Sequence, residues 1–481
     1  MANITSPLRS LLWSGLETIG TVLIGLLSVI VIARLIGPSD FGLAAIGLGL
    51  TLVFIVFISS LVHDGLVRSP DYSDRQLNSA FTFSLLAGIA AAAGLGLLAQ
   101  PLAGFLDEPG LAWVLLCFLP MVLLGALTAP LIAERRRMLD FRTLGRQQLL
   151  TRSIGLAIGI ALAAGGGGVW SVVAQQLTAS GLLFAMLTIK RRGLPRLRID
   201  WRALQPILQF SQYIAWSGLV VQLTERLFLT LVGYLYGLNA AGQWAVASRL
   251  VENITIVLTQ LIYHVALAHM APFRAARAKL AEIATLSRDM LILVALPGLV
   301  AVVAAIEPLV ALLFGEGWAD VPGLIAWMLL GSLFVLRRLF AHVALNVLGR
   351  SGTTFAAFSG ESGTALALLA SLSPLGVMGA ALARGLSFAV GWLVIFHRSA
   401  ALLGMRFRAE VAGLAVDVVV AVAAVSLTAF LLRDVAFGND VTAILCRGAL
   451  AGGLALASLA LLRLGVTRQL ITWLREAILE R

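Results

Sequence analysis

Fourteen apolar stretches, each about as long as a bilayer is thick, follow one another along this chain. A hydrocarbon core of about 30 Å is crossed by roughly 20 helical residues. With 60% hydrophobic and only 12% charged residues, the chain has too little polar surface for a soluble protein, since globular chains carry about 25% charged residues. We therefore predict an all-α polytopic membrane protein with spans at approximately 10–33, 41–63, 79–100, 111–133, 147–165, 168–189, 207–236, 243–268, 288–314, 322–348, 353–372, 376–396, 411–432 and 441–462.

The distribution of charge between these spans indicates the orientation of the chain. If the N-terminus is cytoplasmic, the outer joints hold only Arg34 and Arg433 of the 35 Lys and Arg residues, whereas acidic pairs such as Asp107 and Glu108 favour the outer side. Because basic residues collect on the cytoplasmic side of membranes, we predict that both termini are cytoplasmic. The net charge of +11 then reflects topology, and it gives no reason to expect nucleic-acid binding.

Two halves of the chain repeat the same short motifs at equivalent joints. Leu35–Gly42 corresponds to Leu235–Gly242, and Gly168–Trp170 corresponds to Gly376–Met378. Both halves begin on the same side, so we predict a parallel repeat about an axis along the membrane normal. The predicted segments are an N-lobe of six spans at 1–189, a cytoplasmic linker at 190–206, a C-lobe of six spans at 207–398, and a C-terminal helix pair with its tail at 399–481.

The densest group of polar residues inside apolar runs lies in the predicted hairpin 221–264. On a helix, four of them fall on one face within roughly 60° of one another: Arg249, Asn253, Gln260 and His264. The preceding span adds Gln222 and Arg226. An arginine at the bilayer centre costs about 2.5 to 3.5 kcal/mol on insertion scales, so this face predicts a water-filled cavity or a paired interior rather than contact with lipid.

Three segments resemble the polysaccharide-transporter branch, the Wzx-type flippases, of the multidrug/oligosaccharidyl-lipid/polysaccharide exporter superfamily: Ala33–Gly42, the run from Glu225 through Gly242, and Arg135–Arg142. The resemblance implies two pseudo-symmetric six-helix lobes around a central cationic cavity that opens alternately to each side. It implies a bacterial inner-membrane protein that moves an undecaprenyl-pyrophosphate-linked oligosaccharide to the periplasmic leaflet for exopolysaccharide or O-antigen biosynthesis, with a polymerase and glycosyltransferases as partners. Many members have about twelve spans, so the last two helices are a departure.

Such a substrate would need groups that replace the water around its phosphates. Arginine suits this role, because its fork binds phosphate in a bidentate manner and stays charged when buried. The candidate substrate-binding residues are Arg249, Arg226, Arg384, Arg338, Arg337, Gln222, Asn253 and Gln260. Alternatively, each arginine forms an ion pair between helices, for which the available partners are Glu225, Glu252, Glu307, Glu361 and Asp417.

Three carboxyl groups are candidates for energy coupling. Glu17, Glu361 and Asp417 have no basic residue nearby in the sequence, and an unpaired carboxyl inside a membrane can relay a proton. We predict that at least one of them couples export to a proton or sodium gradient, the alternative being a hydrogen bond between helices. The five histidines are scattered without the spacing of metal ligands, so no metal and no other cofactor is expected.

Two other functions are alternatives to the flippase. A flippase of lipid-linked peptidoglycan precursors would suit fourteen spans. A membrane glycan polymerase or ligase would need acid and base groups held against its acceptor, usually on a sizeable outer loop, and the outer joints here have about ten residues or fewer. We therefore expect a transporter and not an enzyme.

Overall fold

The computed structural model describes residues 5–69, 72–191, 193–435, 437 and 439–463. Within these ranges it contains twelve α-helices, two short 3-10 turns and no strand, which confirms the all-α prediction. Eleven helical segments are long and apolar enough to cross a membrane. Three of them, at Glu17–Arg68, Gly218–Ile256 and Gly352–Leu403, each overlap two of the predicted spans, so every one of the fourteen predicted spans overlaps a segment.

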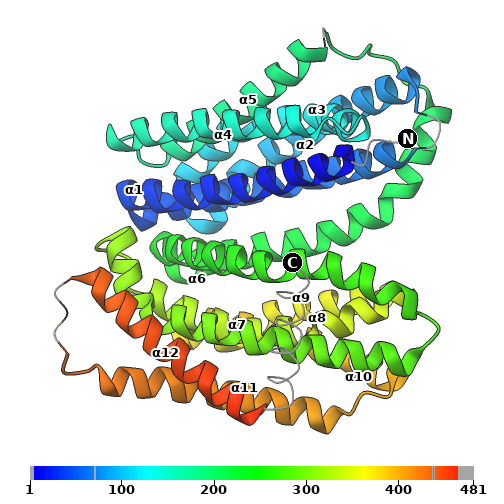
Figure 1. Cartoon of the computed structure of the whole chain (residues 1–481). Helices are drawn as coiled ribbons and strands as arrows, with labels where there is room; N and C mark the ends of the chain where they lie inside the picture. Colours follow the sequence, from blue (N-terminus) through cyan, green and yellow to red (C-terminus); the bar gives the residue numbers. More distant parts are fainter. Residues whose placement is uncertain (1–4, 70–71, 192, 436, 438, 464–481) are drawn as a thin grey trace. The chain divides into compact units, whose positions relative to one another are not determined.

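The chain divides into two compact units, residues 1–246 and 247–481. In the first unit, α1 packs against α3 and α4, and α3 packs against α2 and α5 (Figure 1). This unit contains α1 (Thr5–Arg68), α2 (Asp74–Leu106), α3 (Pro109–Arg137), α4 (Phe141–Ala164), α5 (Trp170–Arg191) and α6 (Trp201–Met270) as far as residue 246. The four-part division expected from the sequence stays a prediction.

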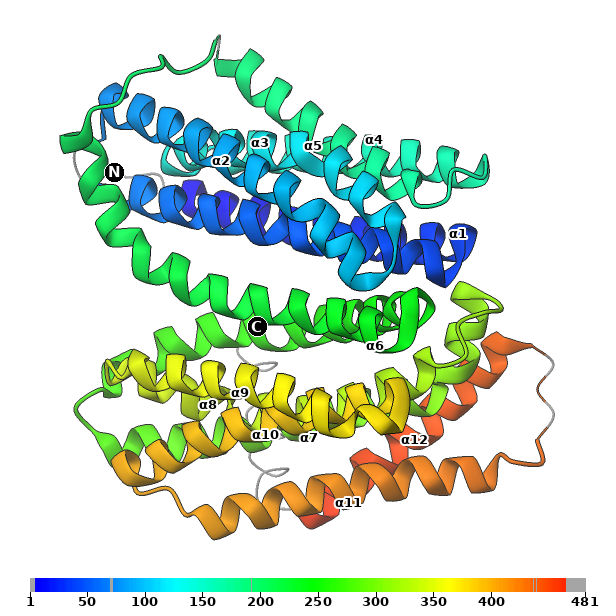
Figure 2. The ribbon, with the colours of Figure 1, turned by 180° about the vertical axis from the view of Figure 1, so that it is seen from behind.

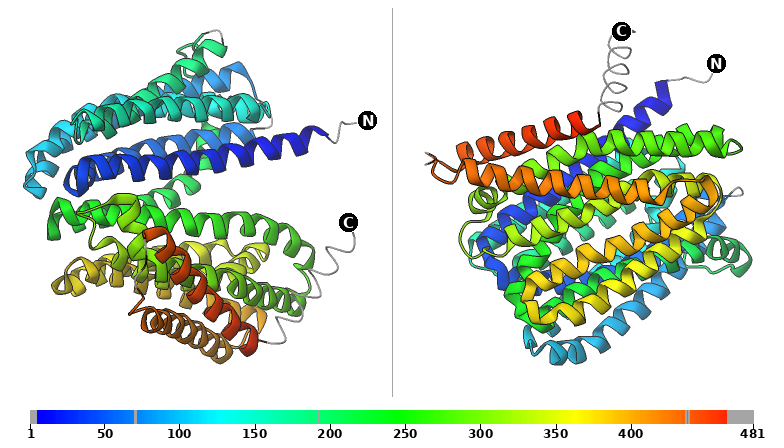
Figure 3. Two further views of the ribbon diagram at one scale, coloured as in Figure 1. Left: turned by 60° about the vertical axis from the view of Figure 1, so that its left-hand side comes forward. Right: turned by 90° about the horizontal axis from the view of Figure 1, so that it is seen from below.

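In the second unit, α10 packs against both α8 and α9, and α7 packs against α8 and α12 (Figure 2). Its elements after α6 are η1 (Ala271–Phe273), α7 (Arg277–Phe314), α8 (Val321–Val347), α9 (Ser351–Leu372), η2 (Ser373–Leu375), α10 (Gly376–Leu403), α11 (Phe407–Leu431) and α12 (Asp440–Leu462). The last two helices, orange and red in Figure 3, are the predicted extra pair, and both contact α7.

Two glycines make matching kinks in the two longest helices. Gly37 in α1 has φ 78° and ψ 171°, and Gly237 in α6 has φ 85° and ψ 171°. Residues other than glycine rarely adopt this backbone conformation, because their Cβ atom would clash with the backbone. The second predicted pair, Gly168 and Gly376, also has positive φ, at 49° and 68°. The repeat read from the motifs therefore recurs in the backbone, although the predicted turn after residue 33 is reduced to a single non-helical residue.

The two kinked corners meet inside the first unit through a second pair of glycines. A Cβ atom added to Gly242 would lie 1.9 Å from the carbonyl oxygen of Pro38, and one added to Gly42 would lie 2.2 Å from that of Leu238. Both neighbours are backbone atoms, so neither position has room for a side chain. This contact packs the middle of α6 against the middle of α1.

The segment between α5 and α6, predicted as a linker, is held against α2. The Asn78 side-chain oxygen accepts a hydrogen bond from the backbone N–H of Arg196 at 2.8 Å. The Ser79 hydroxyl accepts one from the backbone N–H of Asp200, also at 2.8 Å. At the same end of the unit, the Tyr72 hydroxyl donates to Glu134 at 3.2 Å, and burial together with this carboxylate raises the pKa of Tyr72 above its usual value.

Candidate functional site

Among the predicted substrate arginines, Arg226 is the one that forms no salt bridge within the described residues. It lies half-buried on α6 and packs against α1, where a Cβ atom on Gly49 would be 2.9 Å from the Arg226 Cδ. Its Nε is buried and has no hydrogen-bond partner among the described residues. Gln222, four residues earlier on the same face, is also half-buried. A buried donor without an acceptor costs roughly 1 to 3 kcal/mol, which favours a role in contacting something other than the protein.

The second arm of the predicted hairpin carries a different mixture of paired and unpaired groups. Arg249 is exposed and lies 3.6 Å from Glu252, three residues later on the same helix. Asn253 is buried, and its Nδ2 has no hydrogen-bond partner in the described part of the chain. The side chain of Gln260 lies outside the described residues. Arg249 and Asn253 share a helix face, as predicted, and both lie in the second unit.

Arg337 belongs to a closed ring of six alternating charges in the second unit, which we call the ion-pair ring. Arg337 pairs with Glu410 at 2.8 Å and also with Asp417. Asp417 pairs with Arg463, which lies 3.5 Å from Asp289. Arg288 completes the ring, because it pairs with Asp289 at 2.9 Å and with Glu410. The members come from α7 (Arg288, Asp289), α8 (Arg337), α11 (Glu410, Asp417) and the residue after α12 (Arg463).

The ion-pair ring allows six charged side chains to lie inside an apolar helix bundle. The side chains of Glu410 and Asp417 are fully buried, and that of Arg337 is 1% exposed. Burying a single ion is very costly, but three cations alternating with three anions leave no net charge. The ring joins α11 and α12 to α7 and α8. It is therefore a buried polar attachment of the extra helix pair.

Most of the ring was not foreseen, because four of its members lie at the ends of predicted spans: Arg288, Asp289, Glu410 and Arg463. Basic residues in such places are normally interpreted as topology signals. One signal in the sequence could have revealed the ring. Glu410 and Asp417 are seven residues apart and thus lie on the same face of one helix, and that face is otherwise apolar.

The neighbouring Arg338 points to different helices, as expected for adjacent residues on a helix. Arg338 Nη1 lies 2.5 Å from Glu361 of α9, and Arg384 of α10 lies 3.9 Å from the same carboxylate. The two guanidinium groups also lie over aromatic rings, Arg338 over Phe358 at 5.1 Å and Arg384 over Phe388 at 4.5 Å. One buried carboxylate is thus shared by two of the predicted substrate arginines.

The three predicted coupling carboxyls differ in whether they form salt bridges. Glu361 and Asp417 have no basic residue near them in the sequence, but the expectation that they are therefore unpaired is wrong, since both form salt bridges with arginines that are distant in the chain. Glu17 is buried against Gly145 and has no salt bridge among the described residues, although Arg136 and Arg152 act on it electrostatically. The coupling role of all three stays a prediction.

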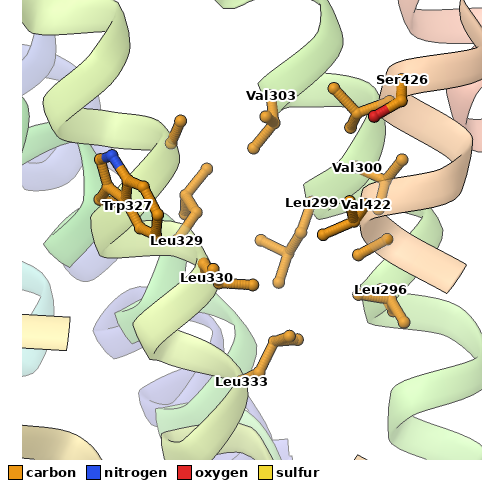
Figure 4. A pocket seen from close by; sticks show the side chains of 13 residues that line it. Leu296, Leu299, Val300, Val303, Trp327, Leu329, Leu330, Leu333, Val422 and Ser426 are labelled. Carbon is orange, nitrogen blue, oxygen red and sulfur yellow. The ribbon is translucent and has the colours of Figure 1, made fainter. Parts of the chain in front are cut away.

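An apolar cleft of about 220 Å³ opens between α7, α8 and α11 in the second unit (Figure 4). Leu299 of α7, Trp327 and Leu330 of α8 and Val422 of α11 line it, and no charged side chain does. The cleft uses a helix of the extra pair as one wall. Elsewhere in the described ranges, no three His, Cys, Asp or Glu side chains gather as they would around a metal ion.

Comparison with known sequences identifies the family. A family described as "Polysaccharide biosynthesis protein" matches residues 31–322, more than half of the chain. The succinoglycan biosynthesis transport protein ExoT of Rhizobium meliloti (strain 1021) is 25% identical over 334 residues, covering 69% of this chain and 66% of ExoT. The teichuronic acid biosynthesis protein TuaB of Bacillus subtilis (strain 168) is 23% identical over 305 residues, covering 63% and 62%. The matches thus span slightly less than two thirds of each relative.

Solved structures show the same fold. The lipid II flippase MurJ in an inward closed conformation superimposes with a TM-score of 0.77 at 15% identity, covering 96% of this chain and all of MurJ. An inward-facing multidrug resistance MATE family transporter of the MOP superfamily gives 0.59 at 14% identity, covering 80% and 95%. The predicted fold class is therefore confirmed. This multi-pass membrane chain belongs to the polysaccharide biosynthesis protein family and has the fold of the MOP-superfamily transporters.

Proposed function

We propose that this protein is a flippase for undecaprenyl-pyrophosphate-linked oligosaccharide repeat units. It carries them from the cytoplasmic to the periplasmic leaflet of a bacterial inner membrane by alternating access, for exopolysaccharide or O-antigen biosynthesis. Membership of the polysaccharide biosynthesis family supports this function. So does similarity to a protein named for succinoglycan transport, and so does a fold shared with a lipid II flippase.

The observation that carries the proposal is the unpartnered Arg226 within an apolar segment of α6. Its Nε is buried and lacks an acceptor among the described residues. Phosphate oxygens are the acceptors that a guanidinium binds best, because its planar fork matches their spacing. Asn253 offers a second buried donor of the same kind, suited to a sugar hydroxyl or a phosphate. Arg226 is thus the residue we assign to the diphosphate.

The apolar cleft supports the lipid half of the proposed substrate. A polyprenyl chain is a pure hydrocarbon, and its contact with protein is favoured where apolar side chains such as Leu299, Leu330 and Val422 form the walls. We propose that the cleft receives part of this chain while the headgroup crosses the membrane. This would give the extra helix pair a role, since α11 forms one wall.

Orientation, coupling and partners belong to the same proposal. Both termini would be cytoplasmic, because the basic joints then face inward. Glu17 is the coupling carboxyl that we favour, since it is buried and has no salt bridge in the described part of the chain. Glycosyltransferases would supply the lipid-linked substrate, and a polymerase would consume it. The protein itself would make or break no covalent bond.

Reconstituted transport tests the proposal. Proteoliposomes would be loaded with a fluorescent polyprenyl-diphosphate oligosaccharide, and its transfer between leaflets followed with an impermeant quencher. Arg226→Ala should slow transfer by at least about tenfold, because a hydrogen bond to a charged group is worth roughly 1.5 to 3 kcal/mol. Arg226→Lys should be intermediate, since it keeps the charge without the fork. Arg433→Ala removes an exposed arginine and should leave transfer unchanged.

Two outcomes would count against the assignment. Full activity of Arg226→Ala would place the diphosphate elsewhere. Transfer of lipid II without transfer of the oligosaccharide would favour the alternative function, a peptidoglycan-precursor flippase. In cells, that alternative predicts that loss of the gene stops wall synthesis and growth, whereas the proposed function predicts loss of a polysaccharide with growth maintained.

A further inference from the structure

A separate basic pocket lies where α8 ends and α9 begins, in the second unit. Its volume is about 390 Å³. Its walls come from the turn between the two helices, the first turns of α9 and the last part of α10: Gly349, Arg350, Gly352, Thr353, Ala356, Val394 and Arg398. Two of these seven residues are arginines from different elements, and none is acidic. The pocket therefore has a positive electrostatic potential.

The arginines of this pocket are not engaged by the protein. In the ranges that the structure describes, neither the Arg350 nor the Arg398 side chain forms a salt bridge or a hydrogen bond, in contrast to every arginine of the ion-pair ring. A third arginine lies close by, because Arg274 Nη2 is 3.8 Å from the position of a Cβ atom on Gly349. Gly349 has φ 75°, which lets the chain turn sharply here.

The other walls indicate what kind of anion would fit. Ala356 and Val394 make one side of the pocket apolar, while the Thr353 hydroxyl adds a polar group beside the arginines. Helix α9, 22 residues long, begins here without a side-chain cap, so its first N–H groups add to the positive potential. A ligand with a phosphate at one end and hydrocarbon at the other would match both walls. A small soluble anion would use only one of them.

We propose that this pocket binds the phosphodiester headgroup of an anionic phospholipid, such as phosphatidylglycerol. The helix ends that form the pocket belong to the side that the basic joints assign to the cytoplasm. Basic pockets between spans at that level are suited to anionic headgroups. The bound lipid would hold the joint between α8 and α9 at the membrane surface. The site is separate from Arg226 and does not depend on the transported substrate.

Lipid binding by the purified full-length protein tests this inference. Binding of dioleoylphosphatidylglycerol and of dioleoylphosphatidylcholine would be titrated in mixed micelles. Wild type should prefer the anionic lipid, and Arg350→Ala/Arg398→Ala should weaken that binding by roughly thirtyfold while leaving the zwitterionic lipid unaffected. The matched control is Arg406→Ala/Arg408→Ala, which removes two exposed arginines at the start of α11. It should retain most of the binding.

Three results would overturn the proposal. Equal losses in both double variants would mean that only general surface charge attracts the lipid. Inorganic phosphate that displaces the lipid at similar concentration would make the ligand a soluble phosphate. Wild-type binding by Arg350→Gln/Arg398→Gln, which keeps side-chain size and folding while removing charge, would exclude the arginines. Arg350→Lys/Arg398→Lys should fall between wild type and the glutamine variant.

Discussion

In the first unit, Glu17 and Arg226 lie within apolar helices and have no salt bridge among the described residues, whereas the second unit encloses six charges that alternate around a closed ring. Insertion of either set into a membrane is costly. In the ring, the ion pairs themselves offset the free energy of burying the charges, so no ligand is needed to account for them. Arg226 has a buried Nε donor without an acceptor among the described residues, so a bound ligand would account for its burial. The difference separates arginines that hold helices together from arginines that are available to a substrate.

The largest effect is expected when one anion is removed from the ion-pair ring, and this tests whether the ring has a structural role. Asp417→Ala leaves Arg337 and Arg463 without one of their anions, and removal of one partner from a buried ion pair costs about 3 to 5 kcal/mol. The free energy of unfolding, measured by denaturing-detergent titration with circular dichroism, should fall by that amount. Glu307→Ala is the control, because its pair with Arg447 is largely exposed and should contribute about 1 kcal/mol or less. Equal stability of the two variants would contradict a structural role for the ring.

A smaller loss is expected at Arg338, which shares its carboxylate. Arg338→Ala removes the contact of 2.5 Å to Glu361 but leaves Arg384 at 3.9 Å, so we expect destabilisation by about 1.5 to 3 kcal/mol. The same titration measures it. Adding Glu361→Gln to Arg338→Ala should cost less than the two single changes together, because they remove one interaction. Strict additivity would show that the two side chains do not interact in the membrane.

The features predicted correctly from the sequence are those set by neighbouring residues. Runs of apolar residues define the spans. The two repeated motifs, Leu35–Gly42 and Leu235–Gly242, contain the glycines that the structure places at φ 78° and 85°. The helix bounds were less accurate, because the predicted turn at 34–40 is confined to Gly37, where two helices meet at a kink.

Charge pairing could not be predicted in the same way. Arg463 and Asp289 are 174 residues apart in the chain, and nothing local indicates that they meet. Arg337 was therefore grouped with the substrate arginines, and Asp417 with the unpaired carboxyls. The sequence names five acidic residues as available partners without assigning a pair, and the structure pairs one of them, Glu361, with Arg338. The pairs that required Glu410 or Arg288 from the span ends were missed.

Arg249 gives the smallest expected change in stability and so tests the distinction most finely. Its side chain is 48% exposed, and its contact with Glu252 at 3.6 Å is between residues on one helix, so Arg249→Ala should alter the free energy of unfolding by about 0.5 kcal/mol or less. If it belongs with Arg226, the same variant should abolish transport of the lipid-linked oligosaccharide while membrane insertion stays normal. Glu252→Ala, which breaks the contact but keeps the arginine, should retain transport. Loss of transport in both variants would mean that the pair, and not the guanidinium alone, is what the transport cycle requires.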